Sequence, residues 1–110
     1  MSAPVDMMKI DVEGAEGRVV IGAADTIARH RPIVVSEFSC EMLRTVSSME
    51  PLAYLDFFHH LGYQLMVIDR SAPGQLGPVV SPTALLDDWG SDLRIEDLLF
   101  LPARSPGTGW

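Results

Sequence analysis

A single cysteine, Cys40, occurs among the 110 residues of the chain. One thiol cannot form an intrachain disulfide or a thiolate zinc site. No apolar run approaches the ~20 residues that a helix needs to cross a bilayer, and the first residues lack the basic and then apolar order of a signal peptide. These absences favour the reducing cytoplasm as the location of the protein, and we expect no membrane partner.

Basic residues are also scarce, because 8 Lys and Arg stand against 15 Asp and Glu and give a formal net charge of -7. The basic side chains are spread along the chain. Non-specific binding to nucleic acid or to an anionic membrane surface depends on clusters of such side chains. We therefore expect no nucleic-acid partner.

Apolar residues are plentiful and make up 47% of the chain. In a chain of this length they suffice for one core but not for the cores of two ordinary domains. We expect residues 1–103 to form a single α/β domain. Residues 104–110 contain Pro and Gly and are predicted to form a flexible tail.

Short apolar runs predict four strands, near residues 7–12, 33–37, 63–68 and 97–101. The continuous β-branched run Ile33-Val34-Val35 is typical of a strand that is buried on both faces. A helical pattern separates the first two strands. The order strand, helix, strand predicts that these two strands are parallel and joined by a crossover.

Apolar residues at helical spacing predict helices between the strands. The first begins near Ala15 and ends at Pro32, with an inner side formed by Val19, Val20, Ala23 and Ile27. The second has Ser47 or Ser48 as its cap, Pro51 in its first turn and Gly62 at its left-handed end, with an inner side formed by Leu52, Tyr54, Leu55, Phe58 and Leu61. The third follows the irregular segment 71–82, is capped by Ser81, ends at Gly90, and directs Leu85, Leu86 and Trp89 inward.

Carboxylates follow the first two predicted strands, at Asp11, Glu13 and Glu37. In an open parallel α/β sheet, ligands bind outside the carboxyl ends of the strands, so these acids are candidates for lining a crevice. A simpler interpretation stays open, in which Glu13 and Glu16 stabilise the start of the first helix and Asp11 caps it. Three carboxylates could hold Mg²⁺ or Ca²⁺, but the run lacks the spacing of a calcium loop and we expect no metal.

Two further groups of chemically active residues are better explained without catalysis. His59 and His60 are adjacent on a predicted helix, diverge by ~100°, and cannot chelate one ion well. Ser36, Ser39 and Cys40 surround Glu37, but no G-x-S-x-G elbow or assigned base accompanies them, so a polar loop is favoured.

Several blocks of sequence, in order, carry a resemblance to a known family. They are "KIDVEGAE" (Lys9–Glu16), the "GA" of Gly22-Ala23, "RPIVVSEF" (Arg31–Phe38), "LGY" (Leu61–Tyr63) and "DLLFLP" (Asp97–Pro102). Together they resemble the C-terminal half of the FkbM-type methyltransferases, which use S-adenosylmethionine and are often O-methyltransferases. The resemblance implies a partial Rossmann-like sheet in three layers, α/β/α, mostly parallel with an antiparallel last strand.

By position, the resemblance makes Asp11, Glu13 and Glu37 candidate catalytic residues that line the methyl-transfer or acceptor pocket. A carboxylate there could orient an acceptor hydroxyl or take its proton. The resemblance implies S-adenosylmethionine as cofactor and a hydroxyl on a small molecule or sugar as acceptor. It assigns no cofactor-binding residue in this chain.

The chain also departs from the family, because the glycine-rich turn that holds the cofactor has no counterpart in it. We expect the isolated chain to be inactive and to bind S-adenosylmethionine weakly or not at all. An exposed strand edge invites pairing, so a homo-oligomer or a missing N-terminal half is expected to cover it. The alternative function is a non-catalytic oligomerising or binding module derived from the same fold.

Overall fold

The computed structural model describes residues 6–68, 77–89 and 95–103. Within them the strands are β1 (Met7–Ile10), β2 (Ile33–Phe38), β3 (Tyr63–Ile68) and β4 (Glu96–Pro102). The helices are α1 (Glu16–His30), α2 (Cys40–Val46), α3 (Pro51–His60) and α4 (Pro82–Trp89). Residues 104–110, residues 71–76 of the predicted irregular segment, Gly90 and the side chain of Trp89 lie outside the described residues.

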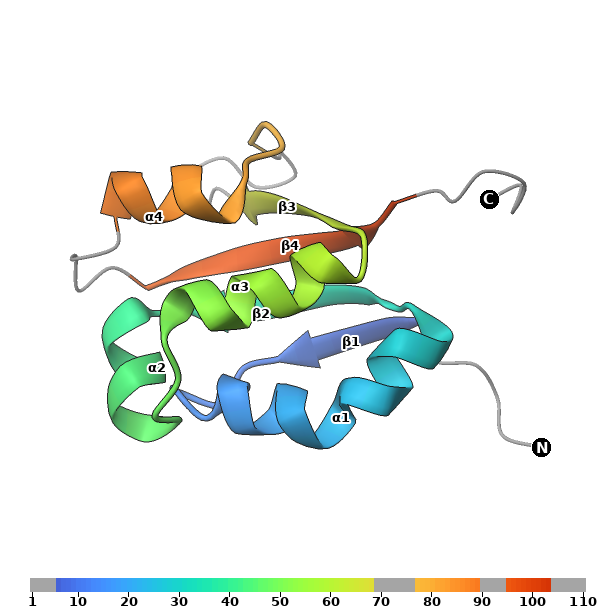
Figure 1. Ribbon diagram of the computed structural model, residues 1–110, viewed down its shortest axis with the longest axis horizontal. Coiled ribbons are helices and arrows are strands. Elements are labelled where there is room, and N and C mark those ends of the chain that lie inside the picture. The colour runs from blue at the N-terminus through green and yellow to red at the C-terminus, as the bar shows by residue number, and fades with distance from the viewer. Residues whose placement is uncertain (1–5, 69–76, 90–94, 104–110) are drawn as a thin grey trace.

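The described strands form one sheet in the order β1-β2-β4-β3 (Figure 1). β1 and β2 are parallel, with Ile10 beside Ser36, which confirms the predicted parallel pair. β4 lies between β2 and β3 and is antiparallel to both, which confirms the predicted direction of the last strand. The sheet therefore brings the amino end of β4 to the edge at which β1 and β2 end.

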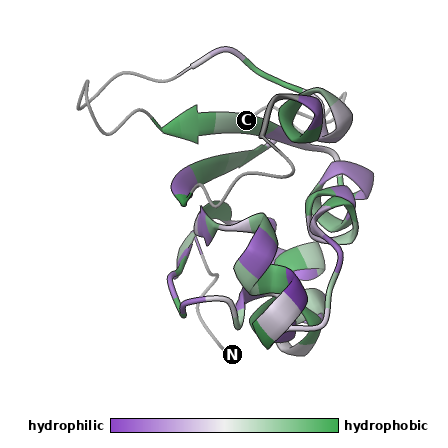
Figure 2. Cartoon of the chain, turned by 90° about the vertical axis from the view of Figure 1, so that its left-hand side faces the viewer, coloured by the Kyte–Doolittle hydropathy of each residue, from purple (hydrophilic) through white to green (hydrophobic). Residues whose placement is uncertain are grey.

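The helices cover one face of this sheet. Figures 1 and 2 show α1, α3 and α4 on the same side of the strands, with α2 beyond the carboxyl end of β2. Alternate residues of β2, Val34, Ser36 and Phe38, are buried toward this layer, whereas the residues between them are more exposed. The expected three-layer arrangement is therefore not met in the part of the chain that the structure describes, which has two layers.

Aromatic side chains form the centre of the core between β2, β4 and α3. The rings of Phe58 and Phe100 are stacked with centroids 4.0 Å apart, and Tyr54 meets Phe58 edge to face at 5.6 Å. Tyr54 is fully buried, and its hydroxyl lies 2.6 Å from the Oγ of Ser36. Burial raises the pKa of Tyr54, so this hydroxyl acts as a neutral hydrogen-bonding group of the core.

The helix boundaries correct two sequence-based expectations and confirm two others. α2 was not predicted, although Ser39 caps it by accepting a hydrogen bond from the Met42 N–H at 3.2 Å. The N-cap of α3 is Glu50 rather than Ser47 or Ser48, because α2 continues to Val46 and leaves only a short link before Pro51. Pro51 at the start of α3 and the left-handed Gly62, with φ 82°, are confirmed.

The inner faces of the helices follow the predicted spacing with two exceptions. Val20, Ile27, Leu55, Phe58 and Leu85 are buried, but Val19 is 36% and Leu52 is 39% exposed. Val19 precedes the buried Val20, and Leu52 and Ala53 lie between the buried Pro51 and Tyr54, so both exceptions fall on the side of their helix that faces solvent. The expected cap of α4 is confirmed, since Ser81 accepts a hydrogen bond from the Ala84 N–H at 3.1 Å.

Arg31 joins three parts of the chain at the end of α1. It has a left-handed backbone with φ 47°, and its guanidinium donates hydrogen bonds to the carbonyl of Leu61 and, at 3.4 Å, to that of Ala103. The guanidinium also lies 5.5 Å from the centre of the Tyr63 ring. Arg31 thus ties the crossover to the turn before β3 and to the end of β4.

We predict that Arg31→Met lowers the free energy of unfolding by about 1–3 kcal/mol, because hydrogen bonds to two carbonyls and the contact with the Tyr63 ring are lost. The matched control is Arg29→Met on the same helix. Arg29 pairs with Asp25 at 2.8 Å, but the two side chains are 70% and 83% exposed. Its loss should cost less than about 1 kcal/mol. Urea denaturation measures both, and equal losses would contradict the role given to Arg31.

Candidate functional site

Three strands bring carboxylates to one edge of the sheet. The β1–β2 register that pairs Ile10 with Ser36 places the next residues, Asp11 and Glu37, side by side. The β2–β4 register places Asp97 opposite Glu37. The three acids form a row across β1, β2 and β4, and Glu37 lies on the face of the sheet that the helices leave open.

Glu37, in the middle of this row, has a raised pKa. Partial burial, followed by a hydrogen bond with Asp11, raises its pKa from 4.5 to about 6. The negative charges of Asp11, Glu16 and Asp97 act in the same direction. A carboxylate with a pKa near 6 is mostly ionised at neutral pH and is still a better proton acceptor than an ordinary one.

The turn between β1 and α1 is held by a buried acid. The side chain of Glu16 is 2% exposed, and its two oxygens accept hydrogen bonds from the N–H of Val12 at 2.9 Å and of Gly14 at 2.8 Å. The N-cap of α1 is Ala15, which makes no side-chain cap. The interpretation of Asp11 as the cap is therefore wrong, whereas Glu16 does stabilise the start of the helix.

Gly14 fastens the same turn to α2. Its φ is 96°, and a Cβ at this position would lie 2.8 Å from Val46 Cγ2 and 2.9 Å from the carbonyl oxygen of Met42. The hydroxyl of Ser47 donates a hydrogen bond to the carbonyl of Gly14. α2 begins two residues after β2. This contact therefore joins the turn that follows Asp11 to the helix that follows Glu37.

The other residues considered from the sequence differ from Asp11 and Glu37, the acid pair, in their surroundings. Glu13 is exposed, has a left-handed φ of 49°, and is not among the groups that shift the pKa of Glu37. Ser36 points into the helical layer toward Tyr54, and Ser39 caps α2. Cys40 is 1% exposed, and burial raises the pKa of its thiol, which disfavours a reactive thiolate.

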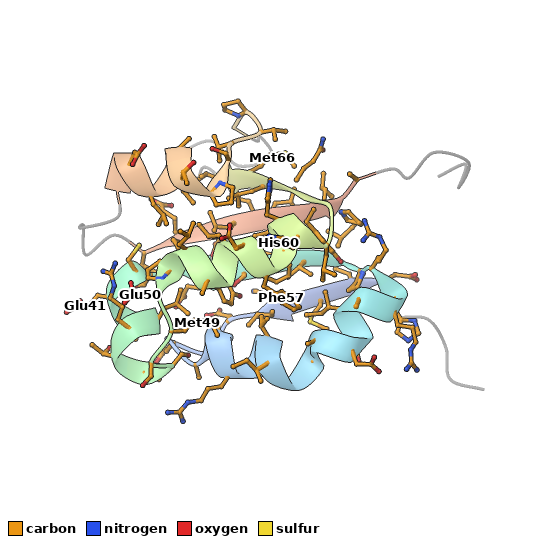
Figure 3. The ribbon with its side chains drawn as sticks, viewed as in Figure 1. Glu41, Met49, Glu50, Phe57, His60 and Met66 are labelled. Atoms are coloured by element: carbon orange, nitrogen blue, oxygen red, sulfur yellow. The ribbon has the colours of Figure 1, made fainter. Side chains whose placement is uncertain are left out.

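His59 and His60 are both exposed. The Nδ1 of His60 lies 2.8 Å from the carbonyl oxygen of Asp56 within α3, and Figure 3 shows His60 on this helix. Among the residues that the structure describes, no three His, Cys, Asp or Glu side chains are placed to hold a metal ion. None of the described helices is both long and apolar enough to cross a membrane.

Comparison with family models gives one match: residues 2–65 fit the methyltransferase FkbM domain. The match covers more than half of the 110 residues. The chain belongs to the FkbM methyltransferase family. Neither the curated proteins nor the solved structures include a match to the chain.

The region matched to the FkbM domain lies in the N-terminal part of the chain and contains the acid pair. It includes β1, α1, β2, α2 and α3 and reaches the first residues of β3. The resemblance noted for residues 97–102 lies outside it. The mixed α/β structure is compatible with a methyltransferase-like fold, and the correspondence to the C-terminal half of the family fold stays a prediction.

Two residues of the candidate site were not recognised as such from the sequence. Asp97 reaches the row because β4 is antiparallel, so the amino end of this strand meets the carboxyl ends of the others. The predicted direction of the last strand was the signal that could have found it. Glu16 was assigned only to the helix start, and no sequence pattern indicates that its carboxylate turns back to the N–H groups of Val12 and Gly14.

We predict that Gly14→Ala destabilises the chain by more than about 2 kcal/mol, because Ala would combine a positive φ with overlap against α2. Gly22→Ala is the matched control in α1, where a new Cβ meets nothing within 4 Å. That substitution should stabilise the chain by up to about 1 kcal/mol. Thermal denaturation of both variants measures the contrast, and a Gly14→Ala chain as stable as the wild type would contradict the described packing of the turn.

The pH dependence of stability should report the state of Glu37. Its contribution to folding is fully present below pH 4.5 and is lost as the pH rises through about 6, because the folded protein holds this proton more tightly than the unfolded chain. Glu37→Gln should therefore be more favourable, relative to wild type, at about pH 8 than at pH 4.5, by up to about 1 kcal/mol after solvent screening.

Urea denaturation at both pH values tests this expectation. Glu41→Gln serves as the control, because Glu41 is an exposed acid of α2 (Figure 3). The change in the effect of Glu37→Gln between the two pH values should exceed the change for Glu41→Gln. An identical effect of Glu37→Gln at both pH values would show that the pKa of Glu37 is not raised.

Proposed function

We propose that the chain forms the acceptor side of an S-adenosylmethionine-dependent methyltransferase and that Glu37 is the general base for an acceptor hydroxyl. The hydrogen-bonded pair of Asp11 and Glu37, with the pKa of Glu37 raised to about 6, is the observation that carries the proposal. A base of this kind suits removal of a proton from a hydroxyl during methyl transfer. The family match supports methyltransferase chemistry.

Asp11 and Glu37 fit the cationic groups of the cofactor better than its carboxylate. Carboxylates at Asp11 and Glu37 can accept hydrogen bonds and complement a cationic sulfonium or ammonium group. The N–H groups of Val12 and Gly14 are used by Glu16 and cannot hold the carboxylate of the cofactor. We therefore expect weak binding by this chain, in the millimolar range, which corresponds to about -4 kcal/mol.

The proposed roles of the chain's own groups follow from this arrangement. The carboxylate of Asp11 accepts a hydrogen bond from protonated Glu37 and so stabilises the proton that Glu37 takes up. Glu37 accepts the proton of an acceptor hydroxyl, whose oxygen becomes the nucleophile. The bound cofactor supplies the electrophilic methyl group. The acceptor is a hydroxyl of a small molecule or sugar. No catalytic contact is assigned to Glu13, whose predicted role stays a prediction.

Amide NMR spectra of the whole chain test this proposal with S-adenosylmethionine and S-adenosylhomocysteine as probes. We expect both to shift the amide signals of Asp11, Val12 and Glu37. The cationic S-adenosylmethionine should bind about three- to fivefold more tightly, because the acidic row attracts its sulfonium. This preference should disappear in Glu37→Gln and remain in Glu41→Gln.

Two results would count against the proposed function. One is the absence of any shift at the sheet edge with either probe at millimolar concentration. The other is a set of shifts concentrated on α3, around His59 and His60. Either result would remove the reason for placing methyl-transfer chemistry at the acid pair. The family match gives no support to the alternative of a non-catalytic module.

We further propose that another polypeptide segment covers the edge of β1, either from a second copy or from a separate N-terminal half. β1 is the outer strand of the described sheet and pairs only with β2 in the described residues (Figure 1). Met7 on this strand is 62% exposed, and Ile21 on the adjoining α1 is 67% exposed. An unpaired strand edge beside exposed apolar side chains favours such association.

A further inference from the structure

The side chain of Glu16 is placed unusually for the first residue of a helix. It does not bond to N–H groups of its own helix but reaches back to Val12 and Gly14, which precede the helix. Its carboxylate is almost completely buried. Val12 directly follows Asp11, so one of these hydrogen bonds fixes the backbone next to the acid that contacts Glu37.

We propose that Glu16 is the positioning residue of the site, holding the turn so that Asp11 stays within hydrogen-bond reach of Glu37. This inference rests on the proposed function for its catalytic meaning, but its geometry does not depend on the cofactor. The hydrogen bond from Ser47 to the carbonyl of Gly14 acts on the opposite side of the same turn. Two contacts therefore fix the turn, one from α1 and one from the segment after α2.

Loss of the negative charge of Glu16 is by itself an alternative explanation for any change in the pKa of Glu37. The ionisable groups that act on Glu37 are Asp11 on the β1 side, Glu16 on α1 and Asp97 on β4. Replacing Glu16 removes a negative charge, which lowers the pKa of Glu37 even if Asp11 does not move. A test of positioning must therefore measure how Asp11 acts on Glu37, not only the acidity of Glu37 itself.

A double-mutant cycle separates the two effects. Carbon-detected NMR follows the titration of the Glu37 side-chain carboxyl in the wild type, Asp11→Asn, Glu16→Gln and the double variant. In the wild-type background, Asp11→Asn should move the Glu37 midpoint from about 6 toward 4.5. In the Glu16→Gln background the same substitution should move it by less than about half as much, because Asp11 is already released.

An equal displacement by Asp11→Asn in both backgrounds would overturn the proposal and leave Glu16 as a distant charge. If Glu16→Gln fails to fold, Ser47→Ala provides the second background, since it releases the other side of the turn and removes no charge. Reduced coupling there would support positioning by the held turn, and unchanged coupling would contradict it. These titrations use no cofactor, so their failure is distinguishable from failure of the proposed methyl transfer.

Discussion

The two hydrogen bonds that the buried carboxylate of Glu16 accepts are the constraint on which the candidate site depends. They satisfy two backbone N–H groups of an irregular turn, that of Val12 in a partly buried place and that of Gly14 in a buried one. Leaving such a group unsatisfied costs about 1–3 kcal/mol. The turn can therefore keep its positive φ values at Glu13 and Gly14. Without Glu16, the turn would keep only the contacts of Gly14 with Ser47 and α2 and the backbone hydrogen bond from Ala15 to Val12.

The pairing of the strands is the second constraint on the candidate site. Parallel pairing of β1 and β2 places Asp11 beside Glu37, and the antiparallel β4 adds Asp97 from the opposite direction. Partial burial of Glu37 and its hydrogen bond with Asp11, together with the negative charges of Asp11, Glu16 and Asp97, raise the pKa of Glu37. The fold thus gives up some stability at neutral pH at the place where the proposed chemistry needs a base, a trade that functional sites often make.

Sequence patterns predicted the regular elements of this structure, which are its helices and strands. The β-branched run at 33–35, the proline at position 51 and the glycine at 62 each identified an element or its end, because each acts on the local backbone. The acids at Asp11 and Glu37 were recognised as edge residues for the same reason, since they follow short apolar strands. Prediction of the hydrogen bond between Asp11 and Glu37 requires the register of β1 and β2, which local sequence patterns do not contain.

The failures have a common physical origin in tertiary contacts. α2 was missed because it has only seven residues, about two helical turns, which is too short for a clear helical period, and Ser39 was interpreted as part of a loop. The cap of α3 was misplaced because α2 occupies the preceding residues. The third layer was inferred from the family resemblance, and none of the described helices lies on that face. None of these outcomes is visible from the spacing of residues within one element.

Hydrogen exchange of the Val12 and Gly14 amides tests the account at its centre. Both N–H groups lie in a turn, where an amide open to solvent would exchange rapidly. If the carboxylate of Glu16 holds them, each should exchange as slowly as the amides of the β1–β2 ladder. Exchange of both at the rate of an unstructured peptide, in a chain whose ladder amides are protected, would show that Glu16 does not hold the turn.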